Sequence, residues 1–214
     1  QAIAAEITTI GKSQANVCLG LCGGTSVSGI YSLLAKEDVA WRKVHFFMVD
    51  ERLVDINSSE SNFKLIKDRL VDPLLKAQKI EKDQVHPFVP LPGKVDVSAV
   101  NYINVLKAHG GKFDVVVLSS GEDGHVGALF PKHHSISSDA GILQVMDDSP
   151  KEPKGRMTIS KNFILESSVG FLLFFGEGKK EVYEKFLEEG TAIEDCPAVM
   201  VKKLPKAYVV SDIA

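Results

Sequence analysis

Five short segments of this sequence are apolar almost without interruption, and this pattern limits the fold more than any other feature. They are Asn16–Leu21, Val44–Val49, Phe113–Leu118, Val169–Phe175 and Ala207–Val210. Runs of this length, rich in Val, Leu and Phe, are typical of strands with both faces covered, as in a parallel sheet.

The segments between these runs carry apolar residues at helical spacing. Three such stripes are Val27, Ile30, Tyr31 and Leu34; Phe63, Ile66, Leu70 and Leu74; and Val182, Tyr183, Phe186 and Leu187. We expect a helix over 60–78, with N-caps offered by 57–59. Strands alternating with helices predict an α/β fold: an open, mostly parallel, doubly wound sheet with helices on both faces. No repeat or linker divides the chain, so we expect residues 1–214 to form one domain.

Charge and composition exclude several classes of protein. The formal net charge of −3 gives the molecule no overall attraction for nucleic acid or an anionic membrane. No apolar run is long enough to cross a bilayer, and no signal peptide is visible. Three cysteines without metal-ligand spacing predict reduced thiols and a cytoplasmic protein. The chain begins at Gln1 without a methionine, which leaves open whether a preceding segment was trimmed.

Ligands of open α/β sheets bind outside the carboxyl ends of the strands. The loops to search are therefore 22–26, 50–58, 119–132 and 176–179. In the first loop, Gly23 and Gly24 allow a sharp turn and a close backbone approach to a ligand. Thr25 or Ser26 can cap the following helix, whose positive end attracts an anion such as phosphate. A plain tight turn with a helix cap is the alternative.

The next two loops carry charged and titratable residues. Asp50 and Arg52, with Glu51 between them, follow the strand at 44–49 and form either a ligand site or a solvated surface ion pair. Asp123 and His125 bracket a glycine, so the carboxylate can lie beside the imidazole and make it a general base.

Alternatives to this general base remain open. His125 could be a structural histidine, or a metal ligand, although no second His or Cys at ligand spacing accompanies it. His133 and His134 are expected on a loop surface, as is the stretch 151–154.

Two cations complete the candidate site. Arg156 opens a short β-like segment after a loop. Lys179 follows a strand and begins a helix, where the helix dipole opposes its charge, so a compensating anion is expected nearby. A charged surface turn is the alternative, because Lys180 stands next to it.

Taken in order, these features resemble the 6-phosphogluconolactonases, within the wider family that includes glucosamine-6-phosphate deaminases. The stretches that carry the resemblance are 23–26, 44–52, 61–63, 121–125 with 129–131, 148–158 and 176–179. The resemblance implies a Rossmann-like fold and hydrolysis of 6-phospho-D-glucono-1,5-lactone to 6-phosphogluconate. It implies no cofactor and no metal, and it leaves open a fusion to or an association with glucose-6-phosphate dehydrogenase.

The resemblance also implies roles for individual residues. His125 would activate water, Asp123 would orient its imidazole, and Arg52 would face the substrate. Arg156 and Lys179 would hold the phosphate. The substrate-binding residues that the resemblance implies are Gly23, Gly24, Thr25, Asp50, Arg52, Arg156 and Lys179.

This sequence departs from the family pattern at Val27, where a proline is usual, and at Val126, where a hydroxyl residue is frequent. A deaminase of the same family remains an alternative function. Such enzymes have Asn-Glu-Pro where this chain has 129–131 and Asp-Glu-Tyr where it has 50–52, and Phe130 cannot carry a proton. A non-catalytic sugar-phosphate-binding regulator is the second alternative.

Overall fold

The computed structural model describes residues 1–213, and a sheet of six parallel strands runs through its centre. These strands are β1 (Val17–Leu21), β2 (Val44–Met48), β4 (Val85–His86), β5 (Val115–Ser119), β8 (Val169–Phe174) and β9 (Ala207–Ser211). All five apolar runs form strands of this sheet, with ends within two residues of those predicted. Such differences are usual for element boundaries.

The strands lie side by side in the order β4-β2-β1-β5-β8-β9. From β1, the strands β2 and β4 extend the sheet in one direction, and β5, β8 and β9 extend it in the other. This is the doubly wound order, and the direction reverses between β1 and β5. The crevice outside the carboxyl ends of these two strands is the expected ligand site.

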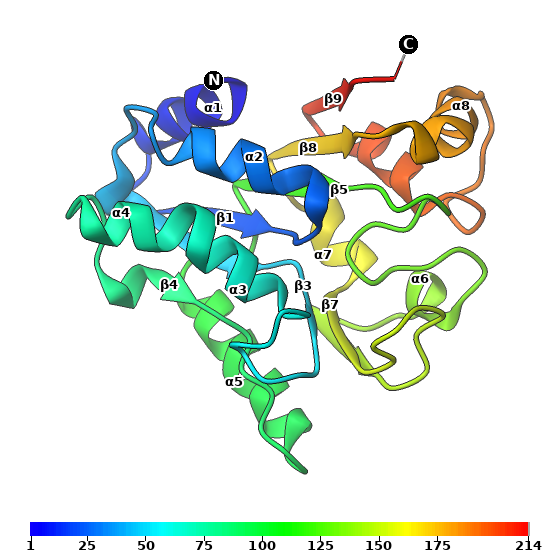
Figure 1. Ribbon diagram of the computed structural model, residues 1–214, viewed down its shortest axis with the longest axis horizontal. Coiled ribbons are helices and arrows are strands. Elements are labelled where there is room, and N and C mark those ends of the chain that lie inside the picture. The colour runs from blue at the N-terminus through cyan, green and yellow to red at the C-terminus, as the bar shows by residue number, and fades with distance from the viewer. Residues whose placement is uncertain (214) are drawn as a thin grey trace.

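Helices cover both faces of the sheet, as predicted. In Figure 1, α1 and α2 lie above it and α5 lies below it. The helices are α1 (Ala2–Gly11), α2 (Thr25–Leu34), α3 (Asn62–Ile66), α4 (Asp72–Lys76), α5 (Val95–Ala108), α6 (His134–Ser137), α7 (Lys161–Leu165) and α8 (Lys180–Leu187). Short 3₁₀ turns are η1 (Trp41–Lys43), η3 (Lys82–Gln84), η4 (Glu177–Lys179) and η5 (Pro197–Lys203).

The helix expected over 60–78 is present as α3, a π-helical turn η2 (Lys67–Val71), and α4. The prediction of its cap was wrong. The N-cap is Ser61, whose hydroxyl accepts a hydrogen bond from the backbone N–H of Lys64 at 3.1 Å. The widened turn has a local reason in Pro73, which lacks an N–H and would clash with the carbonyl of Arg69 in a regular helix.

A second, antiparallel sheet lies beside the first, with strand order β3-β7-β6. It consists of β3 (Asp50–Arg52), β6 (Leu143–Met146) and β7 (Arg156–Ile159). Residues 50–52 were expected in a loop, which was wrong, because the chain passes from β2 into β3 with only Val49 between them. The backbone N–H of Ile159 donates to the carbonyl of Val49 at 2.7 Å and joins the two sheets at this point. The second sheet thereby places its polar residues at the edge of the first.

The helical stripes predicted from the sequence mostly face one apolar core that includes residues of both sheets. Leu187 is an exception, because its side chain is 56% exposed at the end of α8. Among residues 1–213, no helix combines the length and the hydrophobicity that a membrane span requires.

Candidate active site

A cavity of about 270 Å³ lies at the carboxyl ends of β1 and β5, where the strand order reverses. The four loops indicated by the sequence each contribute to its wall, and Arg156 joins them from β7. Gly23, Gly24, Thr25, Asp50, Arg52, His125 and Lys179 all line it. Asp123 lies behind His125, in contact with its ring.

His125 and Asp123 form a close pair. His125 Nδ1 lies 2.5 Å from Asp123 Oδ1, and the backbone N–H of His125 donates to the same oxygen at 3.2 Å. The ring also packs on Phe130, with 4.8 Å between ring centroids. Because Nδ1 is engaged by the carboxylate, Nε2 is the ring nitrogen left to exchange a proton.

The carboxylate of this pair is held in its charged form. Burial alone would raise the pKa of Asp123, but the hydrogen bond from His125 and the charges of His125 and Lys151 hold that pKa well below its usual range. Lys151 Nζ lies 3.4 Å from Asp123 Oδ2. An ionised carboxylate fixes the tautomer of the imidazole and stabilises its protonated form.

Gly121 makes room for the pair. A Cβ atom at this position would lie 2.0 Å from His125 Cε1 and 2.2 Å from Nδ1, closer than any real contact. The N–H of Gly121 donates to the carbonyl of His125 at 2.8 Å and closes the turn. Any residue larger than glycine would push the imidazole out of its position.

Two arginines stand opposite each other on the second sheet. Arg52 of β3 pairs in register with Arg156 of β7, so their side chains leave neighbouring backbone positions. Arg156 is held by hydrogen bonds from Nε to the carbonyl of Pro153 at 2.8 Å and from Nη2 to that of Glu152 at 2.9 Å. Burial lowers the pKa of Arg156, and the charge of Arg52 lowers it further.

The guanidinium of Arg52 has a buried N–H group, at Nε, without a hydrogen-bond partner in the described residues. Its Nη1 donates to the carbonyl of Glu60 at 2.5 Å. Two like charges directly opposite each other on a sheet cost stability, and a buried donor without a partner costs more. A bound anion would offset both costs.

Two acidic residues just before Arg52 position the wall. Asp50 lines the cavity, and its Oδ2 accepts a hydrogen bond from Asn62 Nδ2 at 2.8 Å. Burial raises the pKa of Asp50, although the neighbouring Arg52 and Arg156 oppose that rise. Glu51 is buried and accepts hydrogen bonds from the backbone N–H groups of Arg52, Asn62 and Phe63 and from the hydroxyl of Ser61. Glu51 therefore fastens the start of α3 to β3 and has no group left for a ligand.

The glycine-rich turn presents the amino end of α2 to the cavity. Gly24 has a φ of 104° and is the N-cap residue, without a side-chain cap, so the prediction that Thr25 or Ser26 caps the helix was wrong. Gly23 allows close packing, since a Cβ there would lie 2.0 Å from Asn62 Oδ1. The free N–H groups and the positive dipole end of α2 thus face the cavity.

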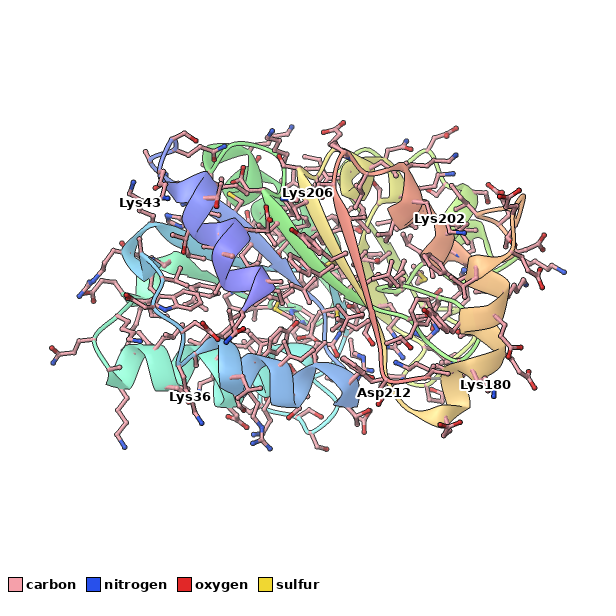
Figure 2. The ribbon with its side chains drawn as sticks, turned by 90° about the horizontal axis from the view of Figure 1, so that it is seen from above. Lys36, Lys43, Lys180, Lys202, Lys206 and Asp212 are labelled. Atoms are coloured by element: carbon pink, nitrogen blue, oxygen red, sulfur yellow. The ribbon has the colours of Figure 1, made fainter. Side chains whose placement is uncertain are left out.

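Lys179 lies at this same end of the cavity. Its Nζ donates to Ser26 Oγ at 2.9 Å and to Ser119 Oγ at 3.1 Å. Burial lowers its pKa. The turn before it is fixed by Asp212, whose Oδ1 accepts a hydrogen bond from the N–H of Gly176 at 2.9 Å. Figure 2 shows Asp212 just beyond β9, close to the start of α8, where Lys180 is labelled.

The sequence did not indicate every residue of this wall. The stretch 151–154 is a surface loop, as predicted, but its Lys151 and Glu152 also line the cavity. Ser119 and Phe130 lie in the predicted loop 119–132, whereas Asn62 reaches the wall from α3 through tertiary packing. The two departures from the family pattern, Val27 and Val126, are fully buried in the apolar core.

Comparisons with known proteins identify the family of this chain. Residues 1–209 match the family described as glucosamine-6-phosphate isomerases/6-phosphogluconolactonase. A 6-phosphogluconolactonase from Borreliella burgdorferi is 32% identical over 197 residues, covering 91% of this chain and 83% of the relative. A 6-phosphogluconolactonase from Mycobacterium tuberculosis is 32% identical over 170 residues, which is 74% of this chain and 67% of the relative.

Solved structures give the same result for the fold. The crystal structure of a 6-phosphogluconolactonase from Thermotoga maritima superposes with a TM-score of 0.85 at 25% identity, covering 99% of this chain and 92% of that protein. The crystal structure of a 6-phosphogluconolactonase from Shewanella baltica superposes with a TM-score of 0.84 at 25% identity. The match covers 98% of this chain and 89% of that protein.

Proposed function

This chain belongs to the glucosamine-6-phosphate isomerase/6-phosphogluconolactonase family, and we propose that it is a lactonase that hydrolyses 6-phospho-D-glucono-1,5-lactone to 6-phosphogluconate, the second step of the pentose phosphate pathway. One observation carries the proposal. The His125–Asp123 pair stands on the wall of a cavity that also holds two opposed arginines. A base and an anion site in one cavity suit a substrate with a hydrolysable bond at one end and a phosphate at the other.

In the proposed mechanism, His125 is the general base. A δ-lactone is an activated ester, so water can attack its carbonyl carbon once a base removes a proton. Nε2 of His125 takes this proton and returns it to the ring oxygen as the tetrahedral intermediate collapses. Asp123 stabilises the imidazolium formed in between. The reaction consumes one water, needs no covalent nucleophile, and calls on no cofactor.

The arginines and Lys179 supply binding energy and charge. Arg156 and Lys179 hold the phosphate in this proposal, with help from the amino end of α2. Arg52 has a buried Nε without a partner in the described chain, which is available for a substrate oxygen, either on the phosphate or on the developing oxyanion. Gly23, Gly24, Thr25 and Asp50 complete the binding wall. Anchoring the phosphate positions the lactone carbon near His125.

The deaminase alternative finds little support in the cavity. Phe130 packs directly on the catalytic ring, where the deaminases carry a glutamate that assists in opening the sugar ring. An apolar ring cannot transfer a proton. Arg52 likewise replaces the deaminase tyrosine and lies on the cavity wall. A non-catalytic regulator would need the cations but not the His125–Asp123 pair.

We further propose that residues 1–214 act as one domain, which the apolar core shared by both sheets supports. The cytoplasm is the compartment we propose, and buried, unpaired Cys18, Cys22 and Cys196 support it. Association with glucose-6-phosphate dehydrogenase stays a hypothesis raised by the resemblance.

The deciding experiment follows proton release from freshly made 6-phosphogluconolactone, with the spontaneous rate subtracted. We expect hydrolysis well above that rate. A parallel assay measures ammonia from glucosamine 6-phosphate, and appreciable release there would assign the chain to the deaminases. Binding of sugar phosphates without either reaction would support the regulator.

A further inference from the structure

Three histidines from distant parts of the chain meet away from the candidate active site. His45 lies on β2, His86 on β4, and His109 directly follows α5. His45 Nδ1 lies 3.0 Å from His86 Nε2, and one ring nitrogen of each histidine lies within 4.8 Å of those of the other two. The ring centroids are 4.2 to 5.3 Å apart.

This cluster is separate from the cavity that we assign to the lactone. None of its members lines that cavity. His45 is the second residue of β2 and precedes Val49 by four positions, which corresponds to about 13 Å along a strand. The proposed lactone chemistry therefore does not explain why three imidazoles converge here.

The hydrogen bonds of His109 prepare one nitrogen for a ligand. Its Nδ1 lies 2.8 Å from the carbonyl of Val105, to which an N–H must donate, so Nε2 carries the lone pair. Histidines that bind metals usually have their other nitrogen fixed in this way by a carbonyl or carboxylate. The thiol of Cys18 is already used in a hydrogen bond, because its Sγ donates to the backbone carbonyl of His109 at 2.8 Å.

We propose that His45, His86 and His109 form a binding site for Zn²⁺, with three imidazole ligands and the fourth position left to water. Tetrahedral zinc with Zn–N bonds of about 2.0–2.1 Å requires ligand nitrogens about 3.3 Å apart. His45 Nδ1 and His86 Nε2 lie 3.0 Å apart in a hydrogen bond, which is close to this value. The nitrogen of His109 lies within 4.8 Å of them, so its ring has to approach by up to about 1.5 Å when the ion binds. A second cavity of about 220 Å³, lined by His86 and Val105, adjoins the cluster and gives an ion a route to it.

Zinc bound here ties together β2, β4 and the end of α5. These elements belong to the first half of the sheet and to the crossover that leads into its second half. The ion stabilises the folded protein, because the unfolded chain holds no such arrangement.

The test titrates ZnCl₂ into the metal-stripped full-length protein by calorimetry in a buffer that does not chelate zinc. His86→Gln and His109→Gln each remove one ligand. His134→Gln is the comparison variant, since His133, His134 and Asp148 are a second group of possible metal ligands in the described part of the chain. We expect one zinc per wild-type chain. The zinc affinity should be at least about 10-fold weaker in either ligand variant, because replacing even a residue that only supports a zinc ligand lowers the affinity by that factor. The affinity of His134→Gln should be unchanged. A loss of zinc binding confined to His134→Gln would overturn the proposal, as would equal zinc binding by all four proteins.

A second measurement uses only the wild type and does not depend on how the variants fold. Long-range ¹H–¹⁵N spectra of the histidine rings are recorded with and without one equivalent of zinc. The proposal requires that the nitrogens of His45, His86 and His109 shift. Shifts confined to His125, His133 or His134 would contradict it.

Discussion

At the scale of single residues, the proposed chemistry depends on the turn 121–125. The turn holds an imidazole against a carboxylate and leaves the second ring nitrogen toward the cavity. Glycines at 121 and 124 permit this conformation, with Gly124 at a φ of 88° and Gly121 directly beneath the ring. Three substitutions test the parts of this turn separately.

Replacing His125 by Ala removes the proposed base. We expect the variant to fold normally and to retain less than about a tenth of wild-type turnover at neutral pH, since general-base catalysis contributes about 10²–10⁴-fold. Turnover is measured by proton release, with spontaneous hydrolysis subtracted. His134→Gln serves as the control and should hydrolyse the lactone as the wild type does. Higher residual activity in His125→Ala would exclude His125 as the base.

Replacing Asp123 by Asn keeps the shape of the side chain but removes its charge. Asp123 Oδ1 lies 2.5 Å from His125 Nδ1, so the carboxylate stabilises the imidazolium that forms during the proposed reaction. Without that charge we expect turnover to fall, but by less than in His125→Ala, because the base itself remains. Proton release from the lactone checks this. Unchanged turnover would leave Asp123 with a role in the turn alone.

Replacing Gly121 by Ala tests the space beneath the imidazole. The added methyl group would overlap His125, so we expect a folded protein with turnover reduced by about 10²-fold or more, as small misplacements of catalytic groups cause. Gly141→Ala is the matched control, since a Cβ there meets no atom within 4 Å. Circular dichroism and lactone hydrolysis are compared for both. Full activity in Gly121→Ala would show that the ring position is not critical.

What the sequence reveals at this scale depends on distance along the chain. His125 and Asp123 could be predicted as a pair because one residue separates them, and spacing alone brings their side chains close. Asn62 could not be identified as a wall residue from spacing, because its neighbour Gly23 lies far away in sequence. Lys151 was correctly expected in a surface loop, but its contact with Asp123 could not be predicted for the same reason.

At the scale of secondary structure, apolar runs correctly predicted five strands of the main sheet. The expectation that both faces are covered was wrong for β9, which lies at the edge of the sheet and is largely exposed. The strands β1, β5 and β8 are apolar along almost their whole length. The strands β3 and β4 are too short to show a pattern, with three and two residues, and β3 consists only of charged residues. The helix α1 lacks a side-chain cap and has no acidic residue in its first turn, so the usual signals of a helix start are missing.

The pairing of β3 with β7 leads to a prediction about substrate phosphate. Arg156→Ala and Lys179→Ala should each lower kcat/KM on the phosphorylated lactone by about 10- to 150-fold, as expected from losing a charge-assisted hydrogen bond of about 1.5–3 kcal/mol. On gluconolactone without phosphate, both variants should resemble the wild type. High salt should weaken substrate binding by the wild type more than by the variants. Equal losses on both lactones would refute the phosphate role.

At the scale of the whole molecule, the cavity draws on both halves of the sheet. The stretches 22–26 and 50–62 belong to the first half, and 119–127, Arg156 and Lys179 to the second. A ligand bound there therefore adds a link between elements that already meet through the core, the β3–β7 pairing and the hydrogen bond from Lys179 to Ser26. Arg52 and Arg156 repel each other, and the charges of Asp50, Glu51 and Glu60 offset part of that repulsion. A bound anion would offset more of it.

Binding of the product should accordingly raise thermal stability. At a concentration of 100 times Kd, 6-phosphogluconate adds about 2.7 kcal/mol, which raises Tm by roughly 5–10 °C for a chain of this size. Differential scanning calorimetry measures this shift. Gluconate at the same concentration should change Tm little, and Arg156→Ala should respond weakly to 6-phosphogluconate. A similar shift with gluconate would mean that the phosphate contributes little to binding.

The hydrogen bond from Gly176 to Asp212 has a consequence for synthesis on the ribosome. Lys179 stands in a turn that is fastened by a residue beyond β9, some 30 positions later in the chain. A domain generally folds as a unit once its sequence has emerged. The turn that carries Lys179 gains its anchor only when Asp212 has left the exit tunnel. The proposed site is therefore complete only after β9 has been synthesised.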